Sequence, residues 1–163
     1  FYFVHPDGAV QHYDKKHLFT FGGEHKRFTA GTERVVVNFR GVRILLEVCY
    51  DLRFPVWARN LGDYDMILYV ASWPTPRVDA WSALLRARAI ENQCYVAGVN
   101  RMGVDPACEY SGGSAIIDPY GKTIAECPWS RESAVSADID MEALQAFRKK
   151  FPVLDDADPF TLI

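Results

Sequence analysis

The sequence predicts a layered α/β domain built on a mixed β-sheet, and three observations lead to this prediction. In the middle of the chain, short apolar runs alternate with helix-like segments, which is typical of strands joined by helices. Antiparallel hairpin patterns lie between and around these units. The 163 residues are 49% hydrophobic and contain no repeat, so a single domain over residues 1–163 has enough apolar material for a core.

Turn residues predict three hairpins. The first joins residues 1–4 to 9–13, the second joins 34–39 to 42–48, and the third joins 114–118 to 122–125. Their turns contain Pro6 with Gly8, Arg40 with Gly41, and Pro119 with Gly121, and glycine and proline favour turn dihedrals. Residues 18–31 are rich in glycine, charge and aromatic rings without periodicity, which predicts an irregular excursion over the surface or the site.

The other elements follow from periodicity. We expect a short helix over 55–62, a strand over 66–71, a helix over 79–93 and a strand over 95–99. The helix over 79–93 is predicted to bury one apolar face, made of Ala80, Ala83, Leu84, Ala87 and Ile90. We also expect an ion-pair network on it, formed by Arg86, Arg88 and Glu91.

The C-terminal part is predicted to form a strand over 134–139 and a helix over 140–151 capped by Asp140. The acidic tail from Pro152 onward is expected to run as a surface arm. The opening residues include neither an initiating Met nor a signal peptide, and the helices are few for covering both faces of a sheet. We therefore expect part of the domain to precede this chain.

Composition limits the partners and the compartment. The formal net charge of −3 gives no reason to expect nucleic acid or an anionic membrane as a partner. No apolar run approaches the roughly 20 residues that span a bilayer. The four cysteines lack C-x-x-C spacing, and a chain this large and apolar does not need disulfides. We expect reduced thiols, no zinc site and a cytoplasmic location.

Cys49 is the main candidate for chemistry. It follows the apolar run 42–48 and precedes polar, helix-compatible residues, so it should stand on a turn that delivers its side chain into a cleft. A thiol is nucleophilic only after a base or cation activates it, and Lys15, His17 and Glu24 are upstream candidates. The alternative is a buried structural cysteine.

A succession of motifs resembles the nitrilase superfamily of carbon–nitrogen hydrolases. The resemblance covers essentially the whole chain, with each motif in the family's order. The matching segments are residues 13–19 (YDKKHLF), Glu24 ahead of 28–31 (FTAG), 49–55 (CYDLRFP), 86–93 (RARAIENQ), and 112–114 (GGS) before 118–121 (DPYG).

The resemblance implies an α-β-β-α sandwich with mixed sheets, of which this chain is the C-terminal part, and a homodimer. Residues 55–62 and the tail are candidates for the dimer surface. It implies hydrolysis of a linear amide with water and without a metal or organic cofactor. The bacterial omega-amidases, which cleave the distal amide of 2-oxoglutaramate and 2-oxosuccinamate, are especially similar at residues 70–74 and 151–158.

The resemblance also implies residue roles. Cys49 matches the nucleophile, Lys15 the lysine and Glu24 the second, supporting glutamate, with Lys16 as the alternative one position along. The family's general-base glutamate belongs to a segment upstream of Phe1. Glu33 and Glu47 are the nearest acidic alternatives for this base but match no family motif, so the isolated fragment is expected to be inactive.

Several residues are candidates for binding the reacting groups. The Tyr50 backbone N–H and Lys15 would donate to the oxyanion that forms during amide hydrolysis. Arg53, Trp73 and Thr75 are candidates for binding substrate, since a guanidinium suits a carboxylate. For Arg53, a structural pairing with Asp51 or Asp65 is the favoured alternative. For Tyr50 and Trp73, the alternative is core packing.

Two rival functions remain open. The first lies in the same class: an N-carbamoyl amino acid hydrolase or another nitrilase-related amidase. The second is a non-catalytic, amidase-like scaffold that binds partners or metabolites. The presence of Lys15, Glu24 and Cys49 argues against the second, whereas the lack of a matching general base in these 163 residues argues for it.

Overall fold

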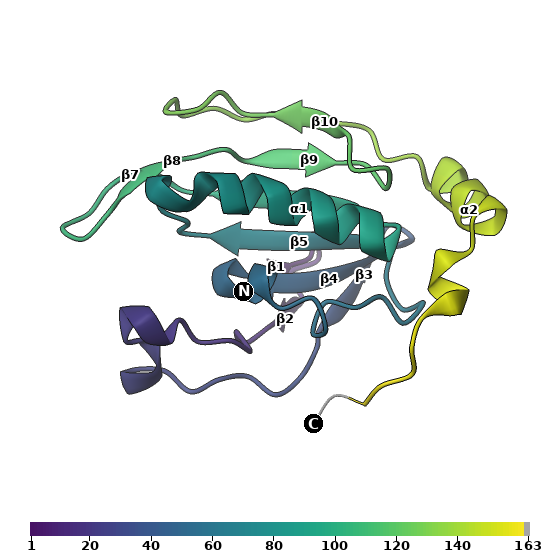
Figure 1. The fold of residues 1–163 in the computed structure, drawn as a ribbon, viewed down its shortest axis with the longest axis horizontal. Helices are drawn as coiled ribbons and strands as arrows, with labels where there is room; N and C mark the ends of the chain where they lie inside the picture. The colour runs from purple at the N-terminus through teal and green to yellow at the C-terminus, as the bar shows by residue number, and fades with distance from the viewer. Residues whose placement is uncertain (162–163) are drawn as a thin grey trace.

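A six-stranded mixed sheet forms the centre of the computed structural model, which describes residues 1–161 (Figure 1). Its strand order is β10–β9–β6–β5–β4–β3. Strands β4 (Val42–Val48), β5 (Met66–Ala71) and β6 (Tyr95–Asn100) run parallel. Strands β3 (Val36–Phe39), β9 (Ala115–Ile117) and β10 (Thr123–Glu126) pair antiparallel with their neighbours. The predicted α/β class and mixed sheet are confirmed.

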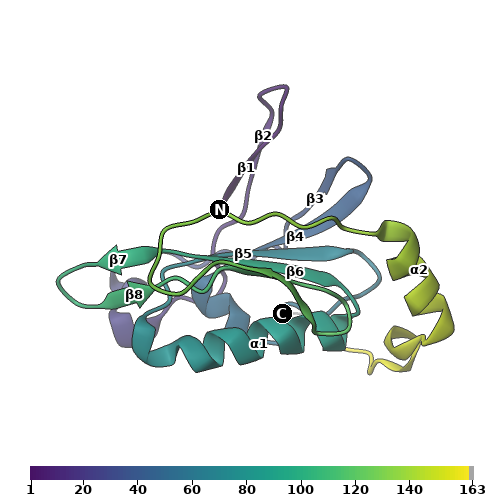
Figure 2. The same cartoon turned by 90° about the horizontal axis from the view of Figure 1, so that it is seen from above.

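The three predicted hairpins are present. The first consists of β1 (Tyr2–Val4) and β2 (Val10–His12), and it projects from the sheet on the side away from the long helix (Figure 2). The other two are β3–β4 and β9–β10. In the β3–β4 turn, both Arg40 (φ 51°) and Gly41 (φ 81°) are left-handed, the conformation that a two-residue hairpin requires.

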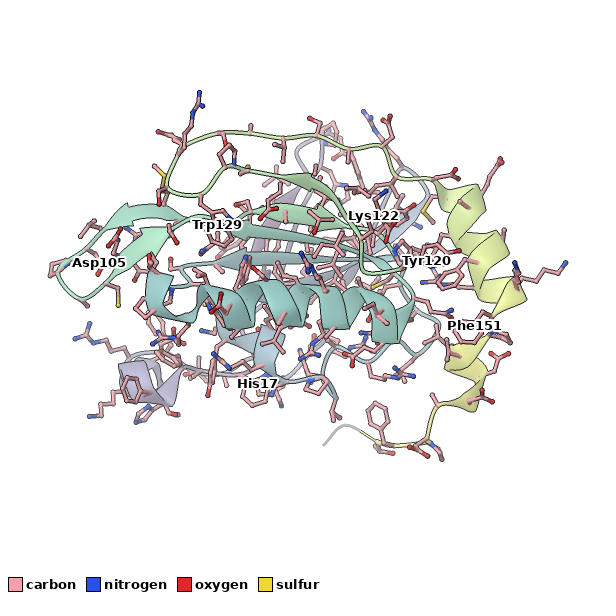
Figure 3. The ribbon with its side chains drawn as sticks, turned by 45° about the horizontal axis from the view of Figure 1, so that its top comes forward. His17, Asp105, Tyr120, Lys122, Trp129 and Phe151 are labelled. Carbon is pink, nitrogen blue, oxygen red and sulfur yellow. The ribbon has the colours of Figure 1, made fainter. Side chains whose placement is uncertain are left out.

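A fourth hairpin was not predicted. Strands β7 (Met102–Val104) and β8 (Glu109–Ser111) pair antiparallel beyond the end of β6. Asp105 closes the turn, because its Oδ1 accepts hydrogen bonds from the backbone N–H groups of Ala107 and Cys108. It lies at the far end of this hairpin in Figure 3. The Asp105-Pro106 pair is a turn signal in the sequence.

Irregular structure over 18–31 is confirmed. This segment contains only two single-turn 3₁₀ helices, η1 (Thr20–Gly22) and η2 (Glu24–Lys26). In Figure 1 this purple loop lies at the end of the sheet toward which β5 points.

Two clusters of buried side chains cover the two faces of the sheet. Helix α1 (Val78–Asn92) packs on one face, where Trp81 and Leu85 meet side chains of β4 and β5. On the other face, Tyr13, Trp57 and Leu144 pack against β4, β5 and β6. Leu144 belongs to helix α2 (Met141–Lys150). The second sheet and outer helix layer of a four-layer sandwich are not formed by residues 1–161.

Helix α1 is confirmed, but its predicted buried face is only partly right: Ala80 and Leu84 are partly buried and pack against the core. Ala83 and Ile90 are exposed, whereas the buried residues are Trp81, Leu85, Arg88, Ala89 and Asn92. The two polar residues are buried because they have partners: Arg88 donates to the Leu52 carbonyl, and Asn92 bonds the backbone of Asn60. Of the predicted ion-pair network, Arg88 pairs with Glu91 at 2.8 Å, while Arg86 is exposed.

The helix predicted over 55–62 is wrong. Residues 55–58 form turns, and no helix is assigned there. The Asn60 backbone N–H donates to Asn92 Oδ1 instead of to a helical carbonyl, and Asn60 Oδ1 accepts from Gly62 N–H. The local bond from Gly62 to the Asn60 side chain is of the kind that competes with helix formation.

The strand predicted over 134–139 is also wrong. This stretch has no regular secondary structure and pairs with no strand of the described chain. Its β-propensity alone does not make a strand without a pairing partner. The next element, α2, is confirmed with its cap, because Asp140 Oδ1 accepts from Ala143 N–H at 2.8 Å. Residues 152–161 of the tail, with the short η5 (Val153–Asp156), are largely exposed as predicted.

Arg148 joins helix α2 to the end of the sheet where β5 begins. Its guanidinium donates to Asp65 Oδ1 at 2.7 Å and to the carbonyls of Tyr64 and Gln93. Arg43 bonds the same carboxylate from β4. These bonds hold the pKa of Asp65 below its usual value against the opposing effect of burial. Over residues 1–161, no helix is long and apolar enough to cross a membrane.

Glu47 is a fully buried carboxyl on β4. It is paired in register with Tyr69 on β5, so both side chains lie on the face covered by α1. Neither carboxyl oxygen has a hydrogen-bond partner among residues 1–161. Burial raises the pKa of Glu47 well above 4.5, and the charge of Asp51 adds to this effect, while Arg34 and Arg88 oppose it.

Glu47→Gln should therefore increase stability at neutral pH. With its pKa raised, the folded state holds a proton that the unfolded chain releases above about pH 4.5, so folding becomes less favourable as pH rises. Each pH unit in that window changes the free energy of unfolding by up to about 1.4 kcal/mol. Urea unfolding of both proteins at pH 4.5 and pH 7.5 should show a gain for the Glu47→Gln variant that is larger at pH 7.5.

Glu126→Gln is the matched control, because Glu126 is an exposed strand glutamate. Its substitution should change stability by less than about 0.5 kcal/mol at either pH. A Glu47→Gln effect that is independent of pH would contradict the assignment of a neutral carboxyl to Glu47.

Candidate active site

Cys49 stands on a strained turn at the end of β4. It is the first residue of the 3₁₀ helix η3 (Cys49–Arg53), and its φ of 50° lies in the left-handed region. A non-glycine residue held there costs about 1–3 kcal/mol, so surrounding contacts must hold it in place. Asp51 supplies one of them, because its Oδ2 accepts from Val48 N–H at 3.2 Å. The predicted position of the thiol at a strand end is confirmed.

The Asp51 carboxylate joins this turn to the segment before η1. It is fully buried and accepts hydrogen bonds from Tyr13 Oη at 2.9 Å, His17 N at 2.8 Å and His17 Nδ1 at 2.9 Å. The His17 ring also stacks on Phe54, with 3.8 Å between ring centroids. His17 therefore orients the loop. Figure 3 shows it below α1, beside the η3 turn.

Lys15 and Glu24 form an ion pair beside this turn. Lys15 Nζ lies 2.7 Å from Glu24 Oε2, which also accepts from Phe19 N–H at 2.8 Å. The Lys15 backbone is fixed by Gly31, whose N–H donates to the Lys15 carbonyl. A Cβ at position 31 would lie only 2.0 Å from the Asp14 carbonyl oxygen, so this close approach requires glycine.

A cavity of about 920 Å³ brings these residues together. It is lined by residues from three segments, 14–29, 48–53 and 70–77, and includes Cys49, Lys15 and Glu24. Lys16 is not among the lining residues; its Nζ lies 5.0 Å from the centre of the Trp57 ring. Within the described part of the chain, Lys15 is thus the lysine that faces the cavity with Cys49.

The Cys49 thiol is held mainly in its neutral form. Burial raises its pKa above 9.0, Lys15 and the contact with the Ser72 carbonyl lower it, and Glu24 and Asp51 raise it. Its Sγ donates only a long hydrogen bond, 3.8 Å, to the Ser72 carbonyl. Nucleophilic chemistry at Cys49 therefore needs a base to take the thiol proton.

No carboxylate or imidazole of residues 1–161 hydrogen-bonds the Cys49 thiol. Glu33 is exposed and Glu47 is buried under α1, and neither lines the cavity. Neither acidic alternative considered from the sequence is thus brought to the thiol. The same residues contain no group of three or more His, Cys, Asp or Glu side chains that could hold a metal ion.

Asn100, at the end of β6, holds the third lining segment of the cavity, residues 70–77, in place. Its Oδ1 accepts from Trp73 N–H at 2.7 Å, and its Nδ2 donates to the carbonyls of Trp73 and Gly112. The Trp73 indole N–H donates to the Arg77 carbonyl at 2.7 Å. Sequence reasoning missed both Asn100 and Arg77. The sequence does carry a signal for Asn100, because it is a polar residue at the end of an apolar strand.

The predicted substrate-binding residues have different positions. Arg53 lines the cavity with its guanidinium 4.9 Å from the centre of the Trp73 ring. The favoured structural pairing is wrong, because Asp51 bonds Tyr13 and His17, and Asp65 bonds Arg43 and Arg148.

Of the other predicted site residues, two line the cavity and one does not. Trp73 and Tyr50 line the cavity, and Trp73 is also buried in the core. Thr75 is not a lining residue, and its buried hydroxyl has no hydrogen-bond partner among residues 1–161. A role for Thr75 in binding substrate stays a prediction.

Comparisons with known proteins agree with this geometry. The family model described as carbon-nitrogen hydrolase matches residues 1–149. The chain is 54% identical to omega-amidase YafV of Escherichia coli K12 over 99% of its own length and 64% of the relative's. It is 42% identical to 2-oxoglutaramate amidase of Bacillus subtilis over 90% of the chain and 57% of that relative.

A solved structure is similar throughout the chain. A CN-hydrolase superfamily protein from Xanthomonas campestris, with an arsenic adduct in its active site, superposes with a TM-score of 0.96 at 48% identity. The alignment covers 99% of this chain and 64% of that one. The chain thus spans less than two thirds of the length of these relatives. From the match over residues 1–149 and the shared structure, the chain belongs to the carbon–nitrogen hydrolase family.

Proposed function

We propose that the protein is an omega-amidase, which hydrolyses the linear amide of a small carboxylic acid through a thioester on Cys49. The observation that carries the proposal is the position of Cys49 on a strained turn, in one cavity with the Lys15–Glu24 ion pair. The named activities of the Escherichia coli and Bacillus subtilis relatives support this class of substrate.

The reaction divides into two steps. The Cys49 sulfur attacks the amide carbon, the C–N bond breaks, and ammonia leaves with the thiol proton, which gives a thioester. Water then attacks the thioester carbon, the C–S bond breaks, and the acid product and the thiol are released. Each step passes through a tetrahedral oxyanion.

Lys15 and the Tyr50 backbone N–H are proposed to donate to that oxyanion. Lys15 faces the cavity, and Tyr50 directly follows the nucleophile on η3. Removing one such donor typically costs roughly 3–4 kcal/mol of transition-state stabilisation. Glu24 holds the lysine at 2.7 Å and is itself fixed by Phe19 N–H, so its proposed role is to position Lys15.

The proton acceptor stays a prediction. The raised pKa of Cys49 makes a base necessary, and the resemblance to the nitrilase superfamily predicts a glutamate upstream of Phe1 for that task. The same resemblance predicts the four-layer α-β-β-α sandwich. The upstream glutamate and the four-layer sandwich are both to be tested on the full-length protein.

Substrate recognition is proposed to use Arg53 and Trp73. The Arg53 guanidinium lies over the Trp73 ring at the cavity wall, so its planar N–H edge is available to a carboxylate. A small amide with a carboxylate at its other end fits this arrangement. The protein is also proposed to be cytoplasmic, which suits its four free cysteines.

A homodimer is proposed through residues 55–62 and the tail. Val56 and Leu61 of the first segment, and Phe151 directly before the tail, are each more than half exposed although they are apolar. Both segments flank the C-terminal end of α1, because Arg59 bonds the Glu91 carbonyl and Gln93 bonds the Phe151 carbonyl. Figure 3 shows Phe151 at this end of the molecule.

The nucleophile assignment predicts the loss of turnover in Cys49→Ala. Ammonia release from 2-oxoglutaramate by the full-length protein should fall by about three orders of magnitude or more. Cys108→Ala is the matched control, since Cys108 is a half-exposed thiol outside the cavity, and it should retain activity. Undiminished turnover in Cys49→Ala would refute the thioester mechanism. A preference for N-carbamoyl amino acids, with release of carbon dioxide and ammonia, would identify the rival hydrolase.

The charges around Cys49 predict the pH dependence of its alkylation. The rate with iodoacetamide, followed by mass spectrometry of the Cys49 peptide, should rise with a midpoint above pH 9.0, because burial raises the thiol pKa. Lys15→Met should move the midpoint higher, since Lys15 stabilises the thiolate. Glu24→Gln should move it lower, since Glu24 destabilises the thiolate. Shifts in the opposite directions would show that the pair does not act on the thiol.

The dimer surface predicts the effect of new charges. Leu61→Asp and Phe151→Asp should each convert the full-length protein from dimer to monomer in sedimentation velocity, because a buried aspartate is unpaired at an apolar contact. Val104→Asp is the control, because Val104 is also exposed but lies on the β7–β8 hairpin. A wild-type protein that sediments as a monomer would refute the homodimer.

A further inference from the structure

Arg77 places a second guanidinium at the cavity with Arg53. It ends the 3₁₀ helix η4 (Thr75–Arg77), and its Cζ lies 5.5 Å from the centre of the Phe19 ring. Arg53 is placed in the same way over Trp73. Stacking uses the face of a guanidinium and leaves its in-plane N–H donors for another partner.

Neither guanidinium is neutralised by the described part of the chain. Residues 1–161 provide no ion pair to Arg53 or Arg77, whereas Arg34, Arg88 and Arg148 each pair with a carboxylate. The Lys15 charge is balanced by Glu24. Asp14 also lines the cavity, but it is exposed and its ion pair, at 3.9 Å, is with His12. The cavity therefore carries an unbalanced positive charge at the two arginines.

The backbone holds Arg77 in place before any ligand binds. Its carbonyl accepts from the Trp73 indole at 2.7 Å, and Trp73 is in turn fixed by Asn100. The ring beneath Arg77 is held as well, because Phe19 contacts the Tyr50 ring with 5.0 Å between centroids. Tyr50 is the residue after the nucleophile. Both arginines are thus fixed relative to Cys49 through aromatic contacts that line the same cavity.

We propose that Arg77 binds the carboxylate of the substrate together with Arg53, so that the site selects amides that carry an anionic group. This inference rests on the proposed amidase function and deepens it by naming a specificity-determining residue. A carboxylate has two oxygens with about four acceptor positions, and each guanidinium fork can fill two of them. A neutral aliphatic amide leaves both guanidinium groups without an anion, so it gains nothing from them.

The test uses ligand protection of Cys49, which does not depend on turnover. Alkylation of Cys49 by iodoacetamide is followed by mass spectrometry in the full-length protein, with 2-oxoglutarate as the protecting dicarboxylate. In Arg77→Gln, the half-protecting concentration should rise about tenfold or more, as expected for loss of hydrogen bonds to a charged group. Arg101→Gln is the matched control: Arg101 stacks on Tyr110 outside the cavity and should leave protection unchanged.

The outcomes separate this inference from the proposed function. An unchanged half-protecting concentration in Arg77→Gln overturns the role of Arg77, even if Cys49-dependent ammonia release is retained. Weakened protection supports it, even if no amide is turned over. The wild-type protein gives a check that needs no variant: 2-oxoglutarate should protect more strongly than neutral glutaramide, and its advantage should shrink in high salt. Equal protection by the two ligands overturns the proposal.

Discussion

The buried Asp51 carboxylate is the contact on which the site depends. Donors from two separate parts of the chain bond it: Tyr13 and His17 in the segment before η1, and the Val48 backbone at the end of β4. Lys15 lies between the first two donors, so the same carboxylate sets the position of the lysine and of the nucleophile turn. Each of these donors would cost about 1–3 kcal/mol if it were buried without an acceptor. The loop before η1 and the end of β4 are therefore held as one unit.

The charges in the cavity are arranged in two groups. Near the thiol, Lys15 and Glu24 act on it with opposite sign, and burial keeps the pKa of Cys49 raised. Farther along the wall, Arg53 and Arg77 are stacked on aromatic rings without a balancing carboxylate from the described residues. A neutral thiol beside a balanced pair resists unspecific oxidation and alkylation, because the thiolate is the reactive form. The unbalanced group attracts an anion.

The sequence predicted the elements whose cause is local. Turn residues located three hairpins, and apolar runs located β4, β5 and β6. It failed where the structure depends on contacts between residues far apart in the sequence. Within 55–62, the Asn60 backbone bonds Asn92 on another element instead of a helical carbonyl, and the buried face of α1 contains Arg88 and Asn92, which apolar periodicity ignores. At the site, family motifs placed Cys49, Lys15 and Glu24 correctly in one cavity. Asn100 was missed because its role depends on a contact between β6 and the loop after β5. Arg77 was missed because its position at the cavity depends on its contacts with Trp73 and Phe19.

The strain at Cys49 and the polar groups beneath it belong to one physical problem. A left-handed φ at a non-glycine residue is unfavourable, so the η3 turn needs fixed partners on both sides. On one side, the Asp51 carboxylate accepts a hydrogen bond from the Val48 backbone. On the other side, Arg88 of α1 donates to the Leu52 carbonyl. Arg88 is itself buried, and its charge acts on the buried Glu47 carboxyl. Asp51 and Arg88 are thus two buried polar groups whose bonds hold the nucleophile turn in a conformation that the chain alone does not favour.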